Sequence, residues 1–258
     1  MTMTMRLSKD AIDAAFERHA KYYGDERLWM IPYHVKCWTK AREAFDNDDE
    51  DAFDWLYDEL RKRWQVFRSK NFKAPSSEKV REILDAIPTD LRQRCLRDFA
   101  EPTLGLLDEF WNALTTAGEI KRNIDGPSLV AVTKFLHFWN PRLFVIADRE
   151  VVWEWVFVHG WLWEQVEGVR AELEPVISPT LKEHQFFKTD LMDYLAVLVW
   201  GGRVLRDNPG VCRAFESHVK HNAKGPVDLN LHEYEGAALE WLLLGLVEVP
   251  PEGVVVQE

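Results

Sequence analysis

The sequence predicts a mostly α-helical protein, and three observations lead to that fold class. Apolar residues recur at three- and four-residue steps along most of the chain, which is the period of an amphipathic helix. No segment alternates apolar and polar residues over the length that a sheet would need. No repeat of fixed period appears. We therefore expect an all-α, multi-helix unit spanning 1–258, built as two packed helical lobes.

The N-terminal lobe, 1–100, begins with Ser8 as the expected N-cap of its first helix. The clearest amphipathic helix in the chain lies here, acidic at its start and basic at its end, as the helix dipole favours. Ser76 or Ser77 is the expected cap of the next helix, which ends at Pro88. Helices are predicted over 8–23, 49–70, 77–87 and 89–102.

The central region, 101–220, contains most of the remaining predicted helices. Asn140-Pro141 ends the helix that begins at Ser128, because the residue before a proline disfavours helical geometry. Helices are predicted over 101–118, 128–138, 148–158, 161–176, 181–200 and 208–221, with an extended run at 142–147. The C-terminal part, 221–258, is expected to be one helix over 231–247 followed by a loose tail.

The composition is that of a soluble globular protein, with 47% hydrophobic and 29% charged residues. Twelve tryptophans supply apolar area for a core and for a pocket. Cys37, Cys95 and Cys212 are far apart and form no CxxC pair, which argues for a reducing compartment and against disulfides or a zinc site. No signal peptide and no run long enough for a membrane span appears. We expect a cytoplasmic protein with no metal, cofactor or membrane partner.

Charge is unevenly distributed along this acidic chain, whose net charge is −11. Residues 46–59 contain eight acidic residues and no basic one, whereas 61–97 holds eleven basic and four acidic residues, a balance of +7. Residues 121–149 hold five basic and two acidic residues, a balance of +3. The basic segments either form one anion-facing surface or neutralise acidic neighbours on solvated helices, and for 61–97 alone the second interpretation is favoured.

The stretch from Asp125 to Arg149 carries the candidate chemistry. Asp125, Gly126 and Pro127 are typical of a turn, and Ser128 stands where a helix begins, so backbone N–H groups there could hold an anion. Lys134 follows on that helix among aromatic and small residues, where desolvation would make its amine more nucleophilic. It is alternatively a snorkelling or salt-bridged lysine.

Asp148 is expected at the start of the next helix, either as a simple N-cap or as a catalytic carboxylate held by the positive end of the helix dipole. His137 is most simply a core-edge histidine bonded to a backbone group. Phe135, Phe138 and Trp139 belong either to the core, the commoner case for such residues, or to a wall on which a base stacks.

The pattern "TKFLHFWNPRLFVIAD", residues 133–148, resembles the core of the helix-hairpin-helix DNA glycosylases, and especially bacterial 8-oxoguanine-glycosylase-like proteins. The resemblance covers about 30 residues, and "DYLAVLVWGG" at 193–202 shows a weaker similarity to the closing helix of those proteins. The hairpin keeps one glycine, Gly126, and Lys134 lies deeper in its helix than the family's catalytic lysine. The resemblance implies a helix-hairpin-helix core within 101–220.

The resemblance also implies an activity, namely hydrolysis of the N-glycosidic bond of a damaged or modified base in double-stranded DNA, for repair or for defence. Asp148 would stabilise the cation or activate the nucleophile, and Lys134 would attack the sugar and so add lyase activity. The expected DNA contacts are Asp125, Gly126, Ser128, Lys121, Arg122, Arg142 and Arg149, and the expected base pocket is Phe135, His137, Phe138 and Trp139.

A rival hypothesis keeps the fold without the activity. The chain would then be a non-catalytic helical binding protein of a defence or toxin system, acting through a protein partner. The net charge of −11 favours this rival, and the placement of Lys134 and Asp148 favours the enzyme.

Overall fold

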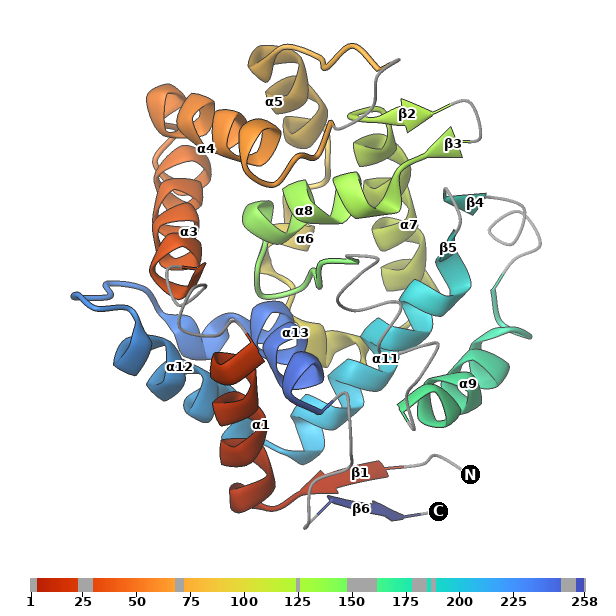
Figure 1. Ribbon diagram of the computed structural model, residues 1–258. Coiled ribbons are helices and arrows are strands. Elements are labelled where there is room, and N and C mark those ends of the chain that lie inside the picture. The colour runs from red at the N-terminus through yellow and green to blue at the C-terminus, as the bar shows by residue number, and fades with distance from the viewer. Residues whose placement is uncertain are drawn as a thin grey trace.

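The computed structural model describes residues 4–22, 30–67, 72–123, 126–147, 162–177, 185–186, 189–246 and 254–257. Helices dominate this part of the chain, which confirms the predicted α-helical class (Figure 1). The α-helices are α1 Lys9–Tyr22, α3 Met30–Asp46, α4 Glu50–Lys62, α5 Ser77–Asp85, α6 Asp90–Gln93, α7 Leu104–Gly118, α8 Leu129–Trp139, α9 Leu162–Leu173, α11 Leu191–Asp207, α12 Gly210–Asn222 and α13 Glu235–Leu246. Two 3-10 helices join them, η1 Leu96–Ala100 and η3 Leu231–Glu233.

Three short antiparallel pairings complete the described structure. They are β1 Thr4–Leu7 with β6 Val254–Gln257, β2 Arg122–Asn123 with β3 Gly126–Pro127, and β4 Gln185–Phe186 with β5 Thr189–Asp190. The first pairing corrects the expectation of a loose C-terminal tail. The β-branched run at 254–256 suits a strand, and it brings the two ends of the chain side by side (Figure 1).

Several helix starts follow from local capping chemistry. The carboxylate of Asp49 accepts a hydrogen bond from the backbone N–H of Ala52 at 2.9 Å at the start of α4. Of the two predicted caps, Ser76 and Ser77, Ser76 caps α5 by accepting from the N–H of Lys79 at 3.3 Å. Thr103 does the same for α7. These side chains satisfy N–H groups that the first helical turn leaves without an intrahelical partner.

The structure differs from the predicted elements in several places. The helix expected over 49–70 ends at Lys62. Helix α3, Met30–Asp46, was not predicted, and it tolerates Pro32 because a first-turn proline lacks only an N–H that has no intrahelical acceptor. The helix expected over 89–102 is divided into α6 and η1, since Arg94 between them is extended. The helix expected over 181–200 begins only at Leu191. The helix expected over 148–158 lies outside the described residues.

Helix α13 lies at the centre of the molecule, and every one of its residues is buried (Figure 1). Helices α1, α11 and α12 pack around it, and α1 crosses it so closely that a Cβ at Gly245 would overlap the backbone of Ala15. An apolar surface on all sides is what a fully enclosed helix requires. None of the described helices, α13 included, is both long and apolar enough to cross a membrane.

Candidate functional site

The candidate site is built on a helix, a tight hairpin and a second helix that follow one another. Helices α7 and α8 pack together, and the β2–β3 hairpin joins them, with Arg122 paired to Pro127 and Asn123 paired to Gly126. Ser128 stands at the N-cap of α8, but its side chain makes no capping bond, and its N–H donates to the carbonyl of Lys121 at 2.9 Å. The hairpin thus uses an N–H that had been expected to face an anion.

Two buried lysines lie beside this hairpin. Lys134, on α8, is 7% exposed, and its Nζ lies 5.5 Å from the centroid of the Trp64 ring. Lys121 is 8% exposed, and its Nζ donates to the carbonyl of Val66 at 2.7 Å. Burial lowers the pKa of Lys121, and the positive charge of Lys134 lowers it further. Lys121, proposed from the sequence as a phosphate contact, therefore lies inside the protein and contacts a backbone carbonyl.

The segment 140–147, which leads from α8 to Asp148, is anchored along its whole length. At its start, Asn140 Nδ2 donates to the carbonyls of Leu91 at 2.7 Å and Arg94 at 3.1 Å. At its turn, the carbonyl of Arg142 accepts from the N–H groups of Leu96 at 2.9 Å and Gly236 at 3.2 Å. The segment therefore binds both the 91–96 region and the N-terminus of α13, whose first N–H groups need acceptors.

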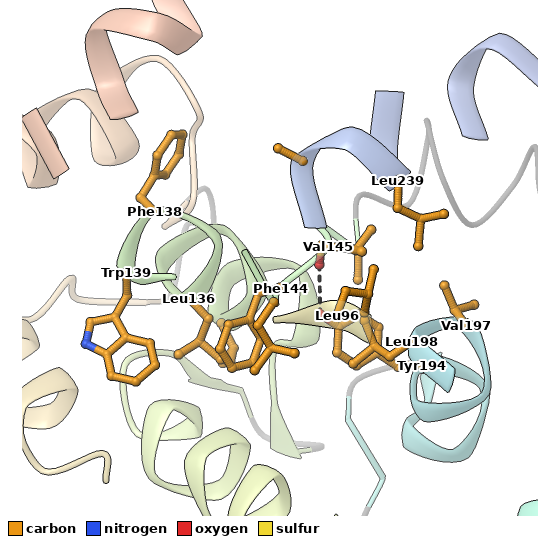
Figure 2. Packing of buried hydrophobic residues seen from close by; sticks show 14 of the residues in the cluster. Leu96, Leu136, Phe138, Trp139, Phe144, Val145, Tyr194, Val197, Leu198 and Leu239 are labelled. Carbon is orange, nitrogen blue, oxygen red and sulfur yellow. Dashed lines mark hydrogen bonds between the residues drawn. The ribbon is translucent and has the colours of Figure 1, made fainter. Parts of the chain in front are cut away.

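The last four residues of this segment each bond to a buried side chain, and Figure 2 shows the bond from Tyr194 to Val145. These bonds join His137 Nδ1 to Phe144 O at 2.9 Å, Tyr194 Oη to Val145 O at 2.8 Å, Ile146 N to Glu240 Oε2 at 3.3 Å, and Ala147 N to Thr133 Oγ1 at 3.0 Å. Side chains from α8, α11 and α13 thus determine where the chain reaches Ala147, the residue before Asp148. Buried polar groups bonded in this way hold one backbone conformation.

His137 is a fully buried structural residue in this arrangement. Its Nε2 lies 3.1 Å from Trp38 Nε1, which can only donate, so Nε2 is the acceptor and Nδ1 carries the proton that goes to Phe144 O. Burial lowers the pKa of His137 to about 3, and its imidazole is therefore neutral. The interpretation of His137 as a core histidine bonded to a backbone group agrees with these contacts.

Several of the sequence-derived site residues fall outside the described part of the chain. Asp148, Arg149 and Asp125 are among them, so their places remain predictions. Arg122 and Gly126 are described through the backbone of the hairpin only.

A cavity of about 440 Å³ lies at the C-terminal end of α8. Phe138, Trp139 and Arg142, three residues singled out in the sequence, line it. The other walls come from α3, from the 89–93 region and from 230–234, and they bring in Trp38, Arg42, Arg92 and Tyr234. Neither Phe135 nor His137 is among the lining residues, although all four of the expected base-pocket side chains are buried. Two of the four expected base-pocket residues, Phe138 and Trp139, thus line the cavity.

The described contacts of the basic stretch 61–97 favour one of the two interpretations of its charge. Arg92 Nη2 lies 2.5 Å from Asp46 Oδ1, Lys62 Nζ lies 2.7 Å from Asp58 Oδ2, and Arg63 Nε lies 3.1 Å from Glu59 Oε2. Arg81 pairs with Asp48. These four basic residues pair with carboxylates of the acidic segment 46–59, as the favoured interpretation predicts.

Sequence reasoning did not identify the residues that anchor the 140–147 segment. Thr133 precedes Lys134 in the sequence and carries no motif of its own, and Glu240 lies within the apolar run 237–246. A carboxylate inside such a run is a usable signal, because a buried charged group needs a specific partner. Glu240 is 6% exposed and lies 3.7 Å from His137 Nδ1 in addition to its bond with Ile146.

Among the described residues, no three His, Cys, Asp or Glu side chains are grouped so as to hold a metal ion. Comparisons of the chain with protein-family models, with curated proteins and with solved structures found no match.

Proposed function

We propose that this protein acts on DNA as an N-glycosylase, hydrolysing the bond between deoxyribose and a damaged or modified base. The observation that carries the proposal is the anchored segment 140–147, which runs from the helix that bears Lys134 to the residue before Asp148. Rigid support of this kind is what a catalytic group needs if it is to be held in a productive position. The order of helix, hairpin and helix in α7–β2–β3–α8 supports the same proposal.

The proposed reaction needs one negative charge and one nucleophile. The carboxylate of Asp148 would stabilise the positive charge that develops on the sugar as the N-glycosidic bond breaks and the base leaves with a proton. Water would supply the oxygen at C1′ and the proton that the base takes. If Lys134 attacks in place of water, its amine forms a Schiff base with the opened sugar, and a hydride donor can reduce that adduct.

The test is single-turnover release of bases from a panel of damaged and modified duplexes. Asp148→Asn should slow release by about 100-fold or more, because it removes the charge that stabilises the transition state. Lys134→Met keeps an unbranched apolar stem at this buried position, and it should abolish any adduct that borohydride traps. Lys220→Met on the exposed face of α12 is the matched control and should leave both readouts unchanged. No release from any duplex by the wild-type protein would refute the proposal.

A second candidate, a non-catalytic protein that binds a protein partner, is favoured by one observation. Lys121 and Lys134 are buried and the basic stretch is paired with carboxylates, in a chain of net charge −11. Duplex binding across a salt series separates the two candidates. A DNA enzyme should lose affinity steeply with salt, and Arg149→Ala should flatten the logarithmic slope by roughly one unit if it contacts one phosphate. Absence of duplex binding at low salt would support the protein-partner candidate.

A further inference from the structure

We propose that the cavity at the C-terminal end of α8 is a binding site for a nucleoside phosphate, which is a phosphate ester of a sugar that carries a planar base. This inference goes beyond the proposed glycosylase activity and does not depend on it, because Lys134 does not line the cavity. At about 440 Å³ the cavity lies within the size range of sites for small molecules.

The cavity has an excess of positive charge. Three arginines line it, Arg42, Arg92 and Arg142, against two carboxylates, Asp46 and Glu233. The lining residues therefore contribute a net charge of +1, in a protein whose overall charge is −11. Guanidinium groups recognise phosphate oxygens through paired N–H donors, so this excess selects an anion.

Of the three arginines, Arg142 has the most donor capacity left for a ligand among the described residues. Arg92 donates to Phe45 O at 2.7 Å and to Asp46 Oδ1 at 2.5 Å, and Arg42 donates to Asp228 O at 2.7 Å. Arg142 Nη1 lies 3.7 Å from Glu233 Oε2, which is beyond hydrogen-bond distance. Its Nε is buried and has no hydrogen-bond acceptor in the described part of the chain. A buried N–H in that state is costly, and a bound oxygen atom would relieve the cost.

The aromatic residues that line the cavity are the reason for proposing a ligand with a planar ring. Trp38, Phe138, Trp139 and Tyr234 line the cavity together with the amides of Gln93 and Asn230. The Trp38 ring is fixed by its bond to His137 and packs edge-on against Tyr234 at 5.6 Å. Tyr234 also brings a phenolic hydroxyl to this lining. An apolar wall with a few polar groups is the usual lining for a planar ligand, whereas a bare phosphate would leave this wall hydrated.

The experiment is titration calorimetry of the full-length protein with four probes. They are a set of nucleoside 5′-monophosphates, the matching nucleosides, inorganic phosphate, and a short strand carrying a 5′-phosphate. We expect a monophosphate to bind at least about tenfold more tightly than its nucleoside and than inorganic phosphate, because both halves of the ligand contribute. The strand probe identifies the source of the ligand. Tighter binding of the strand indicates a phosphorylated end, and tighter binding of the monophosphate indicates a free nucleotide.

Two variants and one control assign the binding to this cavity. Arg142→Ala should weaken monophosphate binding by about tenfold to a hundredfold, and Tyr234→Phe should weaken it by a few-fold without disturbing the fold. Arg61→Ala is the matched control, since Arg61 has similar exposure, 46% against 36% for Arg142, and also lies near a single carboxylate. No binding of any monophosphate, equal binding of inorganic phosphate, or equal losses in Arg142→Ala and Arg61→Ala would each overturn the proposal.

Discussion

A hydroxyl and an imidazole on one face of α8 hold the backbone that leads to Asp148. Thr133 and His137 lie four residues apart, and both are completely buried. Thr133 Oγ1 donates to Leu129 O at 2.9 Å while accepting from Ala147 N, so both of its hydrogen-bonding roles are used. Lys134 follows Thr133 directly, and the side chain that anchors the segment and the candidate nucleophile are therefore positioned by the same turn of helix.

Replacing Thr133 by valine tests this anchoring at the scale of one atom. Thr133→Val keeps the shape of the side chain but leaves the N–H of Ala147 buried without its acceptor, which should lower the free energy of unfolding by about 1–3 kcal/mol. Under the proposed function, base release should also slow while substrate affinity stays unchanged. Urea unfolding and single-turnover kinetics measure the two effects.

Thr39→Val is the matched control, because Thr39 Oγ1 donates only to Val35 O within its own helix. Its loss of stability should stay below about 1 kcal/mol, as a change at a partly exposed site without a long-range bond usually does. Equal losses in the two variants would show that the bond between residues 133 and 147 has no special role.

At the scale of elements, the 140–147 segment and the N-terminus of α13 make a close backbone contact. The first N–H groups of α13 donate to the carbonyls of Pro141 and Arg142. A Cβ at Gly236 would come within 2.7 Å of Phe144 O and 2.9 Å of Pro141 O. Glycine is therefore required here by the close approach of two backbones, and the 140–147 segment packs directly against the N-terminus of α13.

Gly236→Ala should consequently destabilise the protein by about 1–3 kcal/mol, since backbone atoms on both sides would have to move. Gly168→Ala makes the same change on α9, where a Cβ would meet nothing within 4 Å. That control should stabilise the protein by about 0.5–1 kcal/mol through helix propensity. Urea unfolding of both variants measures the contrast. A Gly236→Ala protein as stable as the wild type would show that the two elements are not tightly docked.

The same elements show how far local sequence information reaches. Helix α4 was predictable because Phe53, Leu56 and Leu60 follow the helical period and Asp49 supplies a cap. The break between α6 and η1 was not predictable, because it depends on a hydrogen bond from the Asn140 side chain, 46 residues away, to the carbonyl of Arg94. The cavity was likewise not predictable from local sequence. Phe138 and Arg142 were recognisable as candidates, but their meeting with Trp38 and Arg92 depends on packing between distant helices.

For the molecule as a whole, the central helix is surrounded by aromatic and imidazole rings. Trp241 of α13 stacks on the ring of His19 at 4.2 Å and meets His34 and His218 edge-on at 5.6 and 5.9 Å. His137 extends this group through Trp38, which packs on Trp241 at 5.7 Å. Four histidines from four helices thus pack in the neutral state at the centre of the fold, where a buried positive charge would cost free energy.

This packing predicts that the fold loses stability in mild acid. Burial lowers the pKa of His34 to about 4 and that of His137 to about 3, below the usual 6.5 that applies after unfolding. As the pH falls below 6.5, the unfolded chain takes up protons on these histidines before the folded protein does. The stability that the neutral histidines contribute is therefore complete above pH 6.5 and is lost as the pH falls toward the folded-state pKa. Between pH 7 and pH 5 each of these two histidines should remove about 2 kcal/mol from the free energy of unfolding.

Urea unfolding at pH 7, 6 and 5 measures that loss, and His34→Gln reports how much of it comes from one site. The glutamine cannot take up a proton but can still donate toward the carbonyl of Met30, which His34 Nδ1 contacts at 2.9 Å. The variant should be somewhat less stable than the wild type at pH 7, yet its loss between pH 7 and pH 5 should be smaller by about 2 kcal/mol. A wild-type protein equally stable at pH 7 and pH 5 would mean that the buried imidazoles are hydrated or protonated in the native state, and the neutral aromatic core described above would then be wrong.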